Sequence, residues 1–168
     1  MSNPKVKIVV KGHGTMIAEL YPDMAPKTVE NFVKLVSEGF YSGMIFHRVI
    51  PGFMIQGGGF TEEHEQKEAA SIKGEFRANG FAQNTLKHTR GVLSMARTMV
   101  PNSASSQIFI MHMDSPHLDG QYAGFGKVIE GEEVIDSIAN VPTTTKMMYY
   151  QDWPVDDVVI ESMELLAD

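Results

Sequence analysis

The sequence contains no cysteine among its 168 residues. Disulfides, thiolate nucleophiles, zinc–thiolate sites and iron–sulfur clusters are therefore excluded. Basic residues are in the minority, since 14 Lys and Arg stand against 21 Asp and Glu, for a net charge of −7. That balance argues against nucleic acid or an anionic membrane as the main partner.

Long hydrophobic runs are also missing, because no stretch approaches the ~18 apolar residues of a membrane-spanning helix. The opening segment, MSNPKVKIVV, shows neither the apolar core nor the small-residue cleavage site of a secretory signal. We therefore expect a cytosolic protein with no membrane partner. The composition is 43% hydrophobic and 21% charged, which indicates a packed globule. The length predicts a single domain over residues 1–168.

The remaining pattern is mostly one of short strands. Gly12-His13-Gly14 predicts a turn between two strands, at Lys5–Lys11 and Thr15–Tyr21, because the third glycine of a dinucleotide motif is missing. A last strand is expected within Val155–Leu165. The polar clusters Thr61–Glu68 and Pro142–Lys146 are interpreted as surface loops. Further short β-like segments, cut by Gly and Pro, are Met44–Ile50, Phe53–Gln56, Gly91–Ala96, Gln107–Met111 and Tyr122–Ile129.

Two helices are expected among these strands. Pro26 opens a pattern in which Val29, Phe32, Val33 and Val36 share one helix face, and Gly39 stands where such a helix commonly ends. A shorter pattern follows Gly131, with Val134, Ile135 and Ile138 on one side. Many short strands with only two helices predict a mostly antiparallel β barrel covered by the helices.

Several candidate sites carry little signal. The run Gly57-Gly58-Gly59 lacks a following Lys-Ser/Thr, so it predicts a tight bend where another group approaches the backbone. The six histidines form no H-x-H or H-x-x-x-H pair, so we predict neither a metal site nor a cofactor. The serines of residues 103–106 lack the G-x-S-x-G elbow of a hydrolase.

Arg48 is the most informative charged residue. It lies inside an apolar stretch and is the only Lys or Arg between Lys34 and Lys67. A buried charge without hydrogen bonds is costly, so this side chain needs an acidic partner or a cleft. Strand alternation would place Arg48 on one face and His47 on the other. Gln56 and Gln107 also lie in apolar runs, and one Arg with two Gln among apolar residues is more typical of a binding groove than of an acid–base site.

The run FHRVIPGFMIQGG, from Phe46 to Gly58, resembles the signature of the cyclophilins, a family of peptidyl-prolyl cis–trans isomerases. Three further segments resemble the family in the same order. They are GVLSMAR (Gly91–Arg97), SSQIFI (Ser105–Ile110) and LDGQYAGFGKV (Leu118–Val128). The resemblance covers essentially the whole chain and is closest to the compact bacterial members. It implies a closed eight-stranded antiparallel barrel with a helix over each end.

The resemblance also implies a site. Arg48 matches the catalytic arginine, and Gln56 matches the glutamine that binds the substrate backbone. Gln107 matches a second polar wall, while Ala96 and Arg97 match the edge that pairs with an extended peptide. The walls of the proline pocket match Phe53, Met54, Phe109 and Leu118. Because Phe53 and Met54 are adjacent, the strand must turn or twist there, and we expect Gly52 to help.

Three positions depart from the family pattern. Tyr122 stands where many members have His, and we expect activity to survive because Tyr keeps a ring and a donor. His117 stands where cyclosporin-sensitive members carry Trp, which implies weakened cyclosporin binding. Arg97 replaces the usual Asn, and its side chain either is solvated or favours acidic peptides.

The sequence thus predicts a monomeric isomerase that acts on X–Pro bonds in unfolded or flexible polypeptides. Retention of Arg48 with the pocket residues favours catalysis. The alternatives are a non-catalytic proline-peptide-binding module or chaperone and, more remotely, a hydrolase that uses the 103–106 serines. The hydrolase reading lacks an identifiable base.

Overall fold

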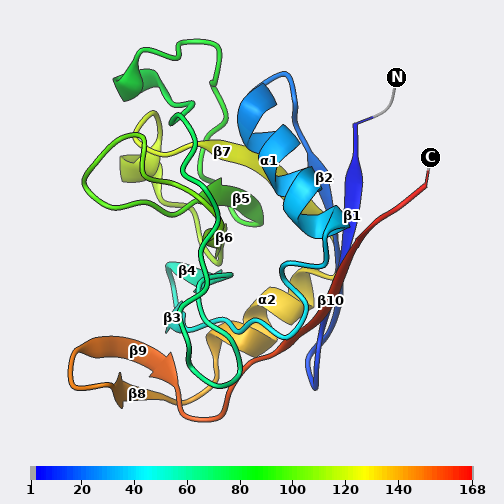
Figure 1. Ribbon diagram of the computed structural model, residues 1–168, viewed down its shortest axis with the longest axis vertical. Coiled ribbons are helices and arrows are strands. Elements are labelled where there is room, and N and C mark those ends of the chain that lie inside the picture. Colours follow the sequence, from blue (N-terminus) through cyan, green and yellow to red (C-terminus); the bar gives the residue numbers. More distant parts are fainter. Residues whose placement is uncertain (1–2, 168) are drawn as a thin grey trace.

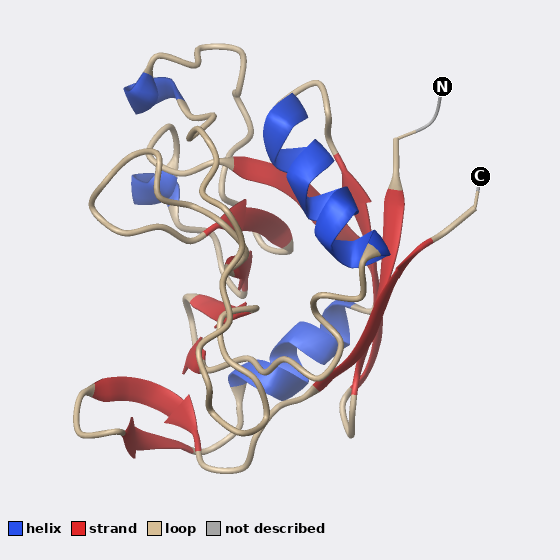
Figure 2. Ribbon diagram, in the orientation of Figure 1, coloured by secondary structure: helices blue, strands red, loops and turns tan. Residues whose placement is uncertain are grey.

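A curled antiparallel sheet dominates the computed structural model, which describes residues 3–167 (Figures 1 and 2). The eight strands of this sheet are joined in the order β10-β1-β2-β7-β5-β6-β4-β3. Their bounds are β1 Lys5–Val10, β2 Gly14–Leu20, β3 Arg48–Ile50, β4 Met54–Gly57, β5 Val92–Met95, β6 Ile108–Met111, β7 Gly124–Glu130 and β10 Ile160–Leu165.

The two expected helices are present within the described chain. α1 spans Pro26–Ser37 and α2 spans Glu132–Ala139. Each buries one face, as the 3.6-residue period requires, with Phe32 in α1 and Ile135 in α2 fully buried in the main core. The two helices lie toward different ends of the curled sheet (Figure 2). No helix within residues 3–167 is long and apolar enough to cross a membrane.

The prediction of a closed barrel is not confirmed, because the sheet forms a curled half-barrel. β10 and β3 are its edge strands, and no continuous ladder joins them within residues 3–167. The expected strand at Met44–Ile50 is regular only from Arg48. Before it, Ile45 forms an isolated antiparallel bridge with Val159.

The prediction of a surface loop at Pro142–Lys146 is wrong, because most of this segment is a β-strand. β8 (Thr143–Lys146) pairs with β9 (Tyr150–Pro154) in a separate two-stranded sheet that projects away from both chain ends (Figure 1). The cause is tertiary, because Trp153 of β9 is fully buried against Ile45 and Phe60. This anchor lies outside the local sequence window that suggested a polar loop.

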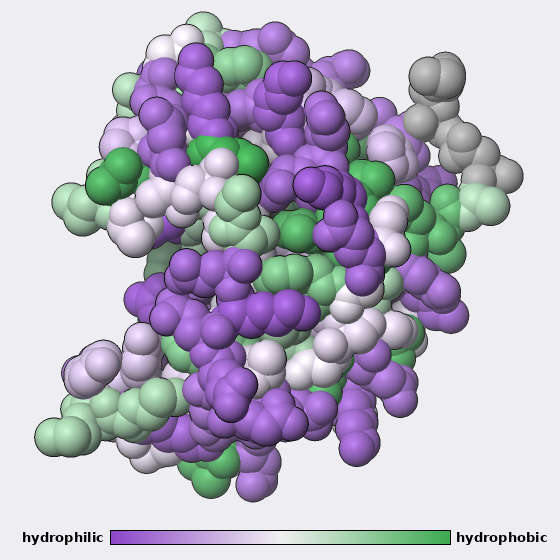
Figure 3. Space-filling model, viewed as in Figure 1, coloured by the Kyte–Doolittle hydropathy of each residue, from purple (hydrophilic) through white to green (hydrophobic). Residues whose placement is uncertain are grey.

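The surface is mainly polar, with a few exposed hydrophobic side chains. Most of the face in Figure 3 is hydrophilic, and hydrophobic surface reaches solvent at the projecting hairpin at the lower left. Met148 and Tyr149 at the hairpin tip are 95% and 74% exposed.

Candidate functional site

One cavity of about 120 Å³ gathers every residue that the sequence assigned to the site except Gln107 and His117. The sheet order explains the gathering, because β4 lies between β3 and β6, and β5 lies on the other side of β6. Segments that are far apart in the chain therefore meet along one surface. The residues lining the cavity are Arg48, Phe53, Met54, Gln56, Ala96, Arg97, Phe109, Leu118 and Tyr122.

Arg48 begins β3 and is opposite Gln56 of β4 in the ladder. Its Nη1 donates a hydrogen bond to Gln56 Oε1 at 3.1 Å, and Gln56 Nε2 donates to Gln107 Oε1 at 2.8 Å. Two amide side chains thus orient the guanidinium. Of the two environments expected for Arg48, an acidic partner or a cleft, the structure shows the cleft, because the side chain is exposed at the polar edge of the cavity and bonds to Gln56. Gln107 lies behind Gln56, and it lines the neighbouring cavities instead.

The other wall is apolar. Met54, Phe109 and Leu118 are buried, and they form a hydrophobic cluster distinct from the main core. The Tyr122 ring meets Phe109 edge-on, with 5.6 Å between the ring centroids. The cavity therefore has an apolar wall on one side and the oriented guanidinium of Arg48 at its edge.

A turn before β4 lets the neighbouring side chains of Phe53 and Met54 face the same cavity, as expected. Gly52 has a φ of +80°, a left-handed conformation that costs glycine little. Phe53 N–H bonds to Ile50 O at 3.0 Å, and β4 begins only at Met54. Both side chains can therefore line one cavity without following strand alternation.

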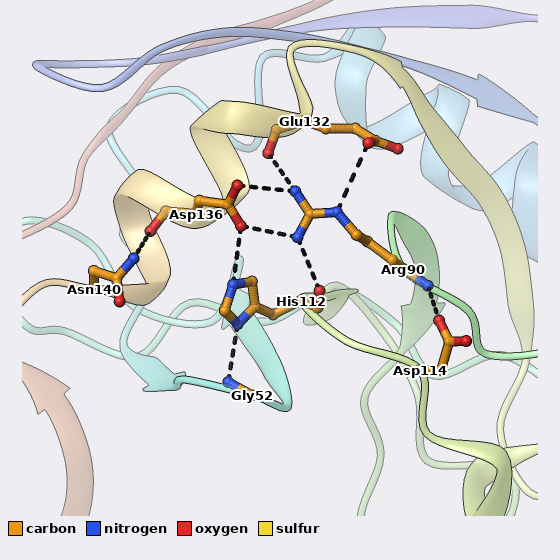
Figure 4. Close-up of polar contacts among 7 residues, drawn as sticks. All are labelled: Gly52, Arg90, His112, Asp114, Glu132, Asp136 and Asn140. Carbon is orange, nitrogen blue, oxygen red and sulfur yellow. Dashed lines mark hydrogen bonds and ion pairs between the residues drawn. The ribbon is translucent and has the colours of Figure 1, made fainter.

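A polar network supports this turn from behind (Figure 4). The Gly52 backbone N–H donates to the ring nitrogen Nδ1 of His112 at 2.9 Å. The backbone N–H of His112 donates in turn to Phe53 O, also at 2.9 Å. On its other side the imidazole contacts Asp136 Oδ1 of α2, with Nε2 at 3.0 Å. Since Nδ1 accepts a hydrogen bond, Nε2 carries the proton and donates to the carboxylate.

Arg90 holds the Asp136 carboxylate through a bidentate ion pair. Nη1 and Nη2 donate to the two oxygens of Asp136 at 2.8 and 3.0 Å, and Nη1 also reaches His112 O at 3.1 Å. The Arg90 hydrogen bond holds the pKa of Asp136 below its ordinary value. No short motif joins Arg90, His112 and Asp136, so this support could not be predicted from the sequence.

The Arg97 side chain is half-buried beside the cavity and is held by neighbouring groups rather than extended into solvent, while the preference for acidic peptides stays a prediction. Its guanidinium carbon lies 4.6 Å from the ring centroids of Phe76 and of Tyr122. Nη2 donates to Gln121 O at 2.6 Å, and Nη1 donates to Thr98 O at 3.0 Å. The charge is therefore held between two aromatic rings at one end of the cavity.

His117 lies at the rim. It is exposed, in the 3-10 turn η2 (Pro116–Leu118), and its ring centroid is 6.0 Å from that of Phe53. It is thus adjacent to the cavity without lining it.

A second feature that the sequence did not reveal lies behind Phe109. His88 Nδ1 is 3.2 Å from Asp119 Oδ1, and His88 Nε2 is 2.8 Å from Ser94 Oγ. The order is that of a serine-hydrolase triad, but Ser94 is fully buried and burial lowers the pKa of His88. Without access for a substrate, this trio supports the Phe109 ring, with which the His88 ring stacks at 6.0 Å.

The hydrolase reading of the 103–106 segment also finds no support. Ser103 Oγ donates to Val100 O at 2.7 Å, and Ser106 Oγ, which is buried, donates to Gly58 O at 2.8 Å. Both hydroxyls thus hold loops together. Among residues 3–167 there is also no group of three or more His, Asp or Glu side chains arranged to hold a metal ion.

Comparison with known proteins gives a consistent result. The family model of the cyclophilin type peptidyl-prolyl cis-trans isomerases matches residues 5–165. The chain is 49% identical to a peptidyl-prolyl cis-trans isomerase of Acinetobacter baylyi over 158 residues, covering 90% of this chain and 80% of that protein. It is 45% identical to peptidyl-prolyl cis-trans isomerase B of Escherichia coli over 160 residues, covering 90% and 93%.

Solved structures agree. A cyclophilin type peptidyl-prolyl cis-trans isomerase of Cryptosporidium parvum superposes with a TM-score of 0.80 at 30% identity, covering 99% of each chain. The same protein crystallised in the presence of the dipeptide Ala-Pro superposes with a TM-score of 0.78, covering 98% of this chain and 99% of that one.

Proposed function

This chain belongs to the cyclophilin-type peptidyl-prolyl cis-trans isomerases and is such an isomerase, and from that premise we propose that Arg48 and the cavity beside it carry out the reaction. The observation that carries the proposal is the pairing of a guanidinium oriented by Gln56 with an apolar wall at one cavity. The substrates are proline-containing segments of unfolded or flexible polypeptides. A relative studied with Ala-Pro supports that substrate class.

The reaction needs no nucleophile and no proton-abstracting base. Rotation of an X–Pro bond breaks amide resonance, with a barrier of ~18–20 kcal/mol, and takes ~10–100 s without a catalyst. Reaching the millisecond range requires roughly 10⁴–10⁵-fold acceleration, or ~5–7 kcal/mol. As the bond twists, the proline nitrogen becomes pyramidal and gains a lone pair. An N–H of Arg48 aimed at that nitrogen stabilises the twisted amide more than the planar one.

The other residues hold the substrate while it rotates. Phe53, Met54, Phe109 and Leu118 enclose the proline ring. Gln56 binds the substrate backbone and also accepts the hydrogen bond from Arg48. Gln107 holds Gln56 in place. The main chain at Ala96 and Arg97 aligns the extended peptide, and Tyr122 and His117 border the pocket. Arginine suits the central role because it stays protonated and presents a rigid fork of donors.

Substitution of Arg48 tests this assignment. Because Arg48 is exposed, Arg48→Ala is expected to leave the unfolding temperature nearly unchanged and to lower kcat/KM about 10²–10³-fold, as for the loss of one transition-state donor. Exchange NMR on an Ala-Pro peptide measures the rate. Arg48→Lys keeps the cation but loses the fork, and should recover only part of the activity.

Arg77→Ala is the matched control, since Arg77 is exposed and lies outside the cavity. It should isomerise the peptide at the wild-type rate. Near-wild-type exchange by Arg48→Ala would remove Arg48 from the mechanism.

We further propose that cyclosporin binds weakly. The support is the exposed His117 at the rim, beside Phe53, where a larger indole would add apolar contact area. His117→Trp is expected to tighten cyclosporin binding about tenfold or more. A fluorescence or calorimetric titration measures the affinity. Equal affinity in both proteins would contradict the proposal.

We also infer that residues 1–168 form one monomeric domain whose sheet is closed into a barrel. The closure is supported by three backbone hydrogen bonds between the segment before β3 and the start of β10. They join Gly43 N–H to Ile160 O, Ile160 N–H to Met44 O and Phe46 N–H to Val158 O, at 2.8 to 2.9 Å. The monomeric state is tested by the molar mass that light scattering gives in solution. The expected cytosolic location is tested by cell fractionation.

A further inference from the structure

A second cavity, of about 390 Å³, adjoins the one assigned to the proline ring. The two share Arg48 and Gln56, so they adjoin at these side chains. A polypeptide seated at Arg48 has to continue past it, and each residue of an extended chain advances about 3.3 Å. The second cavity is therefore within reach of a substrate side chain close to the X–Pro bond.

The β8–β9 hairpin supplies the outer wall of this cavity through Tyr149, Tyr150 and Asp152. Tyr150 is anchored, since its ring meets Phe60 and Trp153 edge-on at 5.4 and 5.7 Å. Tyr149 lies over Tyr150, with 5.0 Å between ring centroids, and is largely exposed. The hairpin thus presents aromatic surface on a wall that is fixed to the core.

Asp152 adds a negative charge to that wall. Its backbone is left-handed, with a φ of +60°, in the middle of a strand. The hydrogen bonds and ion pairs within residues 3–167 include none of its carboxylate, whereas nearby Asp157 contacts both His64 and Lys146. Arg48 belongs to the edge shared with the first cavity, and Asp152 belongs to the hairpin wall alone.

We propose that this second cavity is a subsite for a lysine or arginine side chain of the substrate, next to the X–Pro bond. The aliphatic stem and cationic head pack on the tyrosine rings, and the head pairs with Asp152. The net charge of −7 favours the approach of such basic segments. The assignment rests on the proposed function, because it presupposes that the first cavity holds the proline.

An apolar side chain fits this subsite less well. Gln66, Gln151 and Asp152 line it together with Gln56, and a purely apolar occupant would take water from these groups without replacing their hydrogen bonds. An acidic side chain would face the Asp152 carboxylate.

Peptide series that differ only near the proline test the proposal. Alanine, lysine, arginine, glutamate and phenylalanine are placed in turn at the positions flanking the X–Pro bond, and exchange NMR gives kcat/KM. At one of these positions lysine and arginine are expected to exceed glutamate about fivefold at low ionic strength, with the preference shrinking at high salt.

Asp152→Asn identifies the group responsible. Asn tolerates the left-handed backbone as well as Asp does, so the variant should fold normally. The preference for basic peptides should disappear, while the all-alanine peptide should react as with the wild type. Asp156→Asn makes the same charge change four residues further on, at an exposed position that lines neither cavity, and should keep the preference.

The outcomes separate two failures. A preference for phenylalanine, no preference at any position, or a lysine preference that survives Asp152→Asn would each overturn the basic subsite. Failure of the wild type to isomerise even the all-alanine peptide would instead count against the proposed function.

Discussion

His47 and Arg48 are adjacent in the chain and lie in opposite environments. Arg48 is exposed at the cavity, whereas His47 is 5% exposed and packs against Phe60 and Trp153, with ring centroids 4.8 and 5.6 Å away. Burial lowers the pKa of His47 to about 4, and the charge of Arg48 acts in the same direction. The imidazole is therefore neutral at pH 7.

This burial predicts a dependence of stability on pH. The unfolded chain protonates His47 near its ordinary pKa of 6.5, and the folded chain does so only near 4. Between these values the unfolded state binds more protons, so the free energy of unfolding falls as pH falls. The stabilisation is fully present above pH 6.5, and its loss reaches about 3 kcal/mol once the pH has passed below 4.

Urea unfolding at pH 7, 5.5 and 4 measures this loss. Burial also lowers the pKa of His88, so the test is the difference between wild type and His47→Phe, which keeps a ring against Trp153. The variant should lose clearly less stability across this range. Identical slopes for the two proteins would show that His47 does not carry the effect.

At the scale of elements, α2 and the turn between β3 and β4 are coupled through His112. The imidazole joins Asp136 of α2 to the Gly52 N–H, and the next residue, Phe53, lines the cavity. Gly131 makes the close approach of α2 possible. Its φ is +82°, and a Cβ there would lie 2.2 Å from Thr15 O.

His112→Ala is expected to loosen that turn. The Gly52 N–H loses its acceptor, which should lower the free energy of unfolding by about 1 kcal/mol. Because Phe53 is then less fixed, kcat/KM should fall roughly three- to tenfold, a fraction of the loss expected for Arg48→Ala. Exchange NMR and thermal unfolding measure the two effects.

His112→Asn is the matched variant, because its Oδ1 can replace Nδ1 as the acceptor for the Gly52 N–H. It should recover most of the activity although the contact with Asp136 is lost. If both variants behave alike, the hydrogen bond to Gly52 does not position the pocket.

At the scale of the whole molecule, the proposed closure of the sheet predicts a pattern of amide exchange. If residues 43–46 and 158–160 close the barrel, their hydrogen-bonded amides should exchange only on global unfolding. Hydrogen exchange followed by NMR should then give Phe46 and Ile160 protection similar to that of Ile8 in β1. Protection several kcal/mol lower at Phe46 and Ile160 would indicate an open seam.

Local patterns predicted a large part of this architecture. The helical spacing after Pro26 and after Gly131 predicted α1 and α2, because a 3.6-residue period records which side is buried. The Gly57–Gly59 run predicted a close approach, and a Cβ at Gly59 would lie 2.5 Å from Gln107 Nε2. The motif around Arg48 predicted the family, which the comparisons confirm.

The family, the helices, most strands and all but two of the residues expected at the site could therefore be predicted from the sequence, the exceptions being Gln107 and His117, which do not line the cavity. Tertiary structure alone decided that Arg97 lies between two rings, that His112 supports Gly52, and that Thr143–Lys146 pairs with the strand of Trp153. The physical reason is sequence separation. Periodicity reports the burial of a residue against its own element, whereas these contacts join groups tens of residues apart or depend on a distant anchor, and only the packed fold brings them together.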